Sequence, residues 1–75
     1  MTKEELLNKL NKENIPTEAV NFDNPIKDGL CIRKVYYRWE VFFRERGKEY
    51  DDIGFSNESD ALQYIYEKLV SLYNR

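Results

Sequence analysis

The stretch RWEVFFRERGKEY, residues 38–50, carries the pattern that decides the fold. Large apolar side chains alternate with charged ones, which is typical of a strand whose two faces meet different surroundings. One face is mainly apolar and is predicted to cover the core; it carries Trp39, Val41, Phe43 and, at its end, Glu45. The other face is predicted to be open to water and carries one aromatic residue among charges: Glu40, Phe42, Arg44 and Arg46. The segment is therefore predicted to be the central strand of a sheet.

Two further strands are predicted on either side of it in sequence. Residues 30–36 (LCIRKVY) and 49–55 (EYDDIGF) are rich in the β-branched and aromatic residues that favour strands. Gly47 supplies the positive φ that a hairpin loop of about three to five residues commonly needs. The connection through Tyr36 and Tyr37 has none of the usual turn residues, so the register of the first strand stays open. Together the three segments predict a three-stranded antiparallel sheet.

A first amphipathic helix is predicted at residues 3–13. Thr2 and Glu5 have the spacing of a capping box, in which each side chain accepts a hydrogen bond from the other residue's backbone. Leucines follow at helical spacing, and the helix should end before Pro16, because the residue before a proline is pushed out of the α region. After one short helical turn, PTEAV, residues 23–29 (DNPIKDG) read as a loop.

A second amphipathic helix is predicted at residues 58–73. Ser56 or Asn57 can cap it, and apolar residues recur at three- and four-residue spacing along it. The predicted fold class is thus α+β in a single domain, residues 1–75: helix, three-stranded antiparallel sheet, helix. Both helices are expected to cover one face of the sheet and to leave the other to water.

The composition narrows the classes of function. The chain has no histidine, so the usual general base and the commonest metal ligand are missing, and its lone cysteine cannot form an internal disulfide. No long apolar run predicts a membrane span, and the charged N-terminus does not resemble a signal peptide. Asp51 and Asp52 are adjacent and point to opposite faces of a regular strand, so no metal site is read there. A cytoplasmic protein without cofactors is expected.

Phe42 allows two interpretations. It either shields the open face of the sheet by packing across strands, or it anchors a partner, since aromatic residues and arginines dominate interface energetics. The candidate partner-binding residues are Tyr36, Tyr37, Glu40, Phe42, Arg44 and Arg46.

The segment from Lys34 to Leu69 resembles a family of small bacterial immunity proteins that are encoded beside polymorphic toxins. The shared pattern is a W-E-V with two aromatics, then E-R-G, an aromatic three residues later, and a phenylalanine before an acidic helix start. Here it is carried by Trp39, Glu40, Val41, Phe42, Phe43, Glu45, Arg46, Gly47, Tyr50, Phe55, Asp60 and Ala61. The turn through Tyr36 and Tyr37 departs from the family pattern, which is richer in asparagine and glycine.

The resemblance implies a cytoplasmic antidote that binds and blocks a cognate toxin, often a nuclease. It implies no catalytic residue of its own, which agrees with the missing histidine.

Other classes of function remain open at this point. Double-stranded RNA-binding domains share the predicted element order, and six basic residues against three acidic ones between residues 29 and 50 keep that alternative. The last helix, however, begins with Glu58 and Asp60, where phosphate binding needs cations, so nucleic acid is not expected. An adaptor that pairs through a sheet edge is the third reading, and homodimerisation would be compatible with it. An enzyme is not expected, because so small a domain has little room for a pocket.

Overall fold

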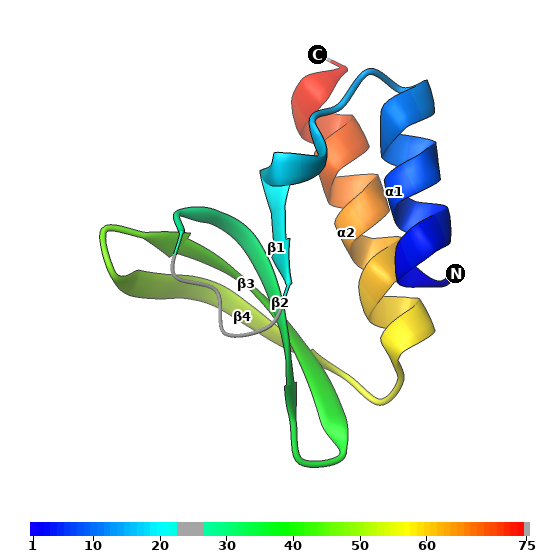
Figure 1. Ribbon diagram of the computed structural model, residues 1–75. Helices are drawn as coiled ribbons and strands as arrows, with labels where there is room; N and C mark the ends of the chain where they lie inside the picture. The colour runs from blue at the N-terminus through cyan, green and yellow to red at the C-terminus, as the bar shows by residue number, and fades with distance from the viewer. Residues whose placement is uncertain (23–26, 75) are drawn as a thin grey trace.

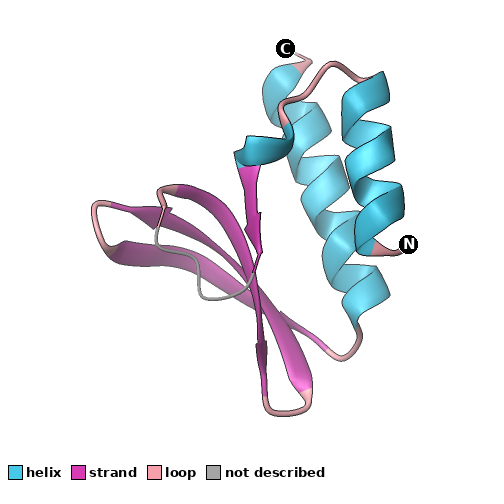
Figure 2. Cartoon of the chain, in the orientation of Figure 1, coloured by secondary structure: helices cyan, strands magenta, loops and turns pink. Residues whose placement is uncertain are grey.

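The computed structural model describes residues 1–22 and 27–74. These residues form an α+β fold in which two helices lie side by side against one side of a four-stranded sheet (Figure 1). Figure 2 shows the same division into helices and strands. In chain order the elements are α1 (Lys3–Lys12), η1 (Thr17–Ala19), β1 (Val20–Phe22), β2 (Gly29–Val35), β3 (Arg38–Glu45), β4 (Lys48–Phe55) and α2 (Glu58–Tyr73). Residues 23–26, most of the predicted loop, lie outside the described part of the chain.

Helix α1 begins and ends as its sequence predicts. The Glu5 N–H donates to Thr2 Oγ1 (3.2 Å), and the Thr2 N–H donates to Glu5 Oε1 (3.1 Å), which completes the capping box. At the other end Asn14 takes a left-handed conformation (φ 58°), and the Ile15 N–H returns to the Leu10 carbonyl at 2.9 Å. This Schellman arrangement satisfies helix carbonyls and turns the buried Ile15 back into the core.

Helix α2 supplies the longest apolar stripe of the core. Asn57 caps it, with its Oδ1 accepting from the Asp60 N–H at 2.8 Å, which confirms one of the two predicted caps. The core lies between both helices and one face of the sheet and contains Leu6, Leu10, Ile15, Val20, Leu30, Ile32, Val41, Ala61, Leu62, Ile65 and Leu69. Four apolar residues of the stripe predicted at residues 58–73 are therefore buried in the core, as their spacing indicates: Ala61, Leu62, Ile65 and Leu69.

The sheet has one strand more than the sequence predicts. Strand β1 pairs in parallel with β2, in the register Val20↔Leu30, and the order β1-β2-β3-β4 makes a mixed sheet, not a three-stranded antiparallel one. Parallel neighbours usually need a crossover of a dozen or more residues. The connection between Phe22 and Gly29 has only six residues, so the sequence gives no sign that residues 20–22 pair with β2.

Both hairpin turns are two residues long and use residues at positive φ. At the β3–β4 turn, Arg46 (φ 52°) and Gly47 (φ 80°) fill both central positions, so the predicted turn is confirmed but is shorter than expected. At the β2–β3 turn, Tyr36 has a φ of 56° although tyrosine rarely adopts this conformation. The turn therefore forms without glycine, asparagine, aspartate or proline, and Tyr36 takes a strained backbone conformation in their place.

A β-bulge interrupts the pairing of β3 with β4. Val41 pairs with Ile53 and Phe43 with Tyr50, so two residues of β4, Asp51 and Asp52, face the single residue between them on β3. Asp51 has a φ of 56°, which aspartate tolerates better than most residues. Because of the extra residue, Tyr50 and Ile53 reach the same face although they are three positions apart.

Candidate functional site

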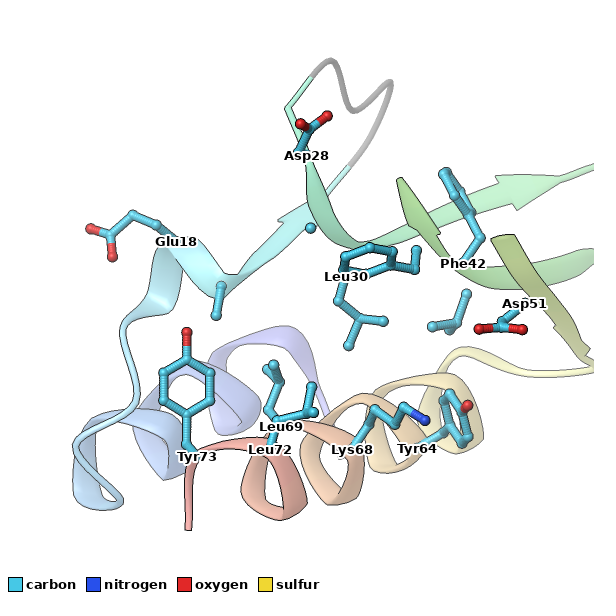
Figure 3. Close-up of a pocket in the computed structure, with 14 residues that line it drawn as sticks. Glu18, Asp28, Leu30, Phe42, Asp51, Tyr64, Lys68, Leu69, Leu72 and Tyr73 are labelled. Atoms are coloured by element: carbon cyan, nitrogen blue, oxygen red, sulfur yellow. The ribbon is translucent and has the colours of Figure 1, made fainter. Parts of the chain in front are cut away.

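The face that carries Phe42 is the one that the helices leave uncovered, but Phe42 is not exposed. Its side chain lies on that face, away from α2 (Figure 3), and only 1% of it is accessible to solvent. Cys31, its pairing partner on β2, is fully buried. Of the two interpretations of Phe42, the buried ring fits packing across the strands. The expectation that this position is open to water is wrong, because alternation fixes the side on which a residue lies and not what covers it.

Arg33 covers the Phe42 ring. Its guanidinium carbon lies 4.4 Å from the ring centroid, a cation–π distance. The same guanidinium donates to Glu40 Oε1 at 3.0 Å and to both carboxylate oxygens of Glu49 at 2.9 and 3.1 Å, and it lies 3.6 Å from Asp52. We call Arg33 and its three carboxylate partners, Glu40, Glu49 and Asp52, the arginine lid, because together they cover the Phe42 ring. Its planar fork of donors joins β2, β3 and β4 over a buried ring.

Two pKa shifts follow from the arginine lid. The hydrogen bonds that Arg33 donates to Glu49, joined by the one that it donates to Glu40, raise the pKa of Arg33 against the opposing effect of burial. The pKa of Asp52 is raised, chiefly by burial and then by the neighbouring Glu40 carboxylate, with Arg33 opposing both. The surroundings of Arg33 therefore favour its charged form, whereas the surroundings of Asp52 disfavour the charged carboxylate.

Cys31 lies beneath the same face. Burial raises the pKa of its thiol, and a hydrogen bond from Asn21 Nδ2 at 3.7 Å lowers it in part. A buried thiol with a raised pKa is a poor nucleophile, so Cys31 is expected to be unreactive.

The remaining predicted residues lie in three places around β3. Glu40 is occupied by the arginine lid, and Arg44 is half-buried. Arg46 lies in the β3–β4 turn, where its N–H donates to Asp28 Oδ1 at 3.1 Å. Tyr36 and Tyr37 lie in the turn at the opposite end of β3 and are 89% and 95% exposed. The structure thus keeps Glu40, Phe42 and Arg44 on one face of β3 and places the other three residues in the turns at its two ends; their contact with a partner stays a prediction.

A cavity of about 460 Å³ opens on the helix-covered side of the sheet. The β3–β4 hairpin extends away from the C-terminal half of α2 (Figure 1), and the cavity lies between them. In Figure 3, Leu30 of the sheet and Leu69 and Leu72 of α2 point toward one another across it. We call it the hairpin groove. Its apolar lining includes Leu30, Val41, Phe43, Leu69, Leu72 and Tyr73. Phe42 also borders it, but the ring of Phe42 points away from the cavity in Figure 3.

Three residues of this lining are large, apolar and exposed. Phe43 is 40% exposed, Leu72 47% and Tyr73 49%. Phe43 was predicted to lie in the core and Leu72 in the buried stripe of the helix, and both lie on the predicted side. They stay accessible because the sheet has turned away from the end of α2. In the sequence, the apolar spacing of α2 continues from Leu69 to Leu72. In the structure Leu69 is the last buried residue of the helix, so Leu72 extends the stripe beyond the core.

The rim of the hairpin groove is mainly acidic. Glu18, Asp28 and Asp51 line it together with a single lysine, Lys68. Asp51 lies there because the bulge places it on the helix side, while Asp52 joins the arginine lid on the other side. The two aspartates therefore point to opposite faces, as predicted.

Comparisons with models of protein families, with curated proteins and with solved structures find no match to this chain. The resemblance to immunity proteins therefore stays a prediction.

The described residues contain no group of three or more histidine, cysteine, aspartate or glutamate side chains that could hold a metal ion. Of the helices described here, neither α1 nor α2 has the length and apolar character needed to cross a membrane.

Proposed function

We propose that this chain is an immunity-type binding protein of the cytoplasm. It binds a cognate bacterial toxin domain and blocks the active surface of that toxin, with no catalytic residue or cofactor of its own. The observation that supports this best is the hairpin groove, where Phe43, Leu72 and Tyr73 offer apolar surface beside an acidic rim. Inhibition by binding needs such an anchor surface and no reactive group.

The residue types in the groove support binding to a protein. Aromatic residues are enriched at the centres of protein interfaces, and charged residues at the edge set partner choice and association rate more than affinity. The resemblance of residues 34–69 to immunity proteins points to the same class of partner.

The start of α2 argues against duplex RNA as the ligand. Glu58 and Asp60 occupy the first turn of the helix, and Asn57 caps it. RNA-binding domains of this element order need cations at the last helix, and carboxylates there repel phosphate. We expect no shift of duplex RNA in a gel at low salt.

Co-expression with the C-terminal domain of the protein encoded immediately upstream tests the proposal. We expect cells that make both proteins to survive, and cells that make the upstream domain alone to die. Ile65→Asp, which puts a charge into the core at a fully buried position, is the unfolded control and should not rescue. An upstream domain without toxicity, or cell death despite folded protein, would contradict the proposed function.

A further inference from the structure

We infer that the hairpin groove binds a protein segment that carries a large apolar side chain flanked by lysine or arginine. The inference rests on the proposed function, since the toxin would supply this segment, and it names the chemistry by which the partner is recognised.

The exposed apolar residues of the groove indicate that the partner inserts a large apolar side chain. Phe43, Leu72 and Tyr73 come from two separate elements, β3 and α2, and line one cavity. Their exposure is therefore contiguous, whereas scattered single apolar residues would need no explanation. The cavity volume of about 460 Å³ lies within the range of pockets that enclose ligand groups. One large side chain inserted beside Phe43 would remove all three residues from water.

The groove is a built feature of the fold. The bulge at Asp51 and Asp52 lies where β4 passes the groove, and bulges increase the local twist of a strand pair. This twist directs the β3–β4 hairpin away from α2, and it also aims Asp51 at the groove. The opening and one of its charges thus have the same local cause.

The cationic part of the inference comes from the rim. Among the described residues that line the groove, three are acidic, Glu18, Asp28 and Asp51, and one is basic, Lys68. In Figure 3 the carboxylates of Glu18 and Asp28 point outward, so they lie at the outer edge of the groove. A segment with flanking lysines or arginines would complement this rim, whereas an acidic segment would be repelled. Toxins that act on nucleic acid need cations along their substrate path, so a segment of that path has the required composition.

A second copy of the chain is a less suitable occupant through its open strand edge. Strand β4 carries Glu49, Asp51 and Asp52 close together, so antiparallel pairing of two β4 edges would place like charges opposite one another. The observations therefore favour a different protein over a homodimer.

The test uses the 75-residue chain and needs no identified toxin. Phage that display random short peptides are selected on it at low ionic strength, and an enriched peptide is synthesised and titrated by calorimetry. We expect enriched sequences to combine an aromatic or large aliphatic residue with lysine or arginine. Phe43→Ala and Leu72→Ala should each weaken binding about tenfold or more, while Ile53→Ala, at an apolar residue that is 38% exposed and does not line the groove, should leave it unchanged.

The charge of the rim is tested separately with isosteric variants. The triple variant Glu18→Gln, Asp28→Asn and Asp51→Asn keeps the side-chain shapes, and asparagine tolerates the positive φ of residue 51. It should weaken binding several-fold at low salt and make binding less dependent on salt. The matched control removes the same charge outside the groove, with Glu4→Gln, Glu13→Gln and Glu67→Gln, and should behave as the natural protein does.

Several results would overturn the inference. They are the absence of enriched peptides, enrichment of acidic sequences, or an enriched peptide whose affinity is unchanged by both Phe43→Ala and Leu72→Ala. Sedimentation that shows a dimer dispersed by Phe43→Ala would replace the partner with a second copy. Failure of this test with successful rescue in cells would leave the proposed function standing without the groove. Selected basic peptides without rescue would leave the groove and remove the toxin.

Discussion

Phe42 and Phe43 are neighbours in sequence and lie on opposite faces of β3, and their surroundings are the reverse of what the alternation predicts. Phe43 lies on the face that the helices cover and is 40% exposed, whereas Phe42 lies on the uncovered face and is 1% exposed. An arginine with its carboxylate partners covers Phe42, and a hairpin that turns away from α2 uncovers Phe43. The side of a sheet on which a residue lies and the exposure of that residue are therefore separate properties.

The largest effect expected from this comparison is on stability. Phe42→Ala should lower the free energy of unfolding by about 3–5 kcal/mol, since a buried ring is replaced by a cavity. Phe43→Ala should lower it by only about 1–2 kcal/mol, because much of that ring already meets water. Urea denaturation of both variants measures the difference. Equal losses would mean that the two rings are buried alike, and the comparison would fail.

A smaller effect is expected from the lid itself. Arg33→Met keeps an apolar stem near Phe42 but leaves Glu40, Glu49 and Asp52 without their cation, and should cost about 1–2 kcal/mol near neutral pH. Arg33→Lys should cost less, since it keeps the charge and loses only the planar fork. Thermal unfolding of both variants at low and high salt checks this. If Arg33→Met unfolds at the temperature of the natural protein, the arginine does not hold the ring in place.

The smallest effect expected is at Asp52. Its pKa in the folded protein lies above the ordinary value for an aspartate, so its charged form is disfavoured in the fold and stability decreases as pH rises through the window above that ordinary value. Asp52→Asn should therefore leave stability unchanged or slightly increased near neutral pH, despite the loss of an ion pair. Relative to the natural protein, the variant should become less favourable as pH falls. A marked destabilisation at neutral pH would show that the ion pair outweighs the burial.

Much of the fold can be predicted from local signals. The capping box at Thr2, the cap at Asn57 and the spacing of apolar residues in both helices act within one or two turns, so the sequence displays them directly. The assignment of Val41 to the core face follows in the same way from period-two alternation.

The features that the sequence does not reveal depend on contacts between distant residues. Strand β1 is three residues long, and among the described strands it pairs with β2 alone. The bulge exists only relative to β3, so Asp51 and Asp52 look like an ordinary pair in a strand. Glu49, which Arg33 reaches across β3, is 16 positions away, and no periodicity indicates that contact. The exposed Phe43 and the buried Phe42 both follow from such contacts.

The central claim is that Phe42 holds the fold while Phe43 and its groove receive the partner. The most direct measurement is an NMR titration of the isotope-labelled protein with a peptide selected as described above. We expect the amide chemical shifts of Phe43, Leu69 and Leu72 to change on binding, and those of Tyr36 and Tyr37 to stay the same. Shifts confined to the tyrosine turn or to the arginine lid, with the groove signals unmoved, would contradict it.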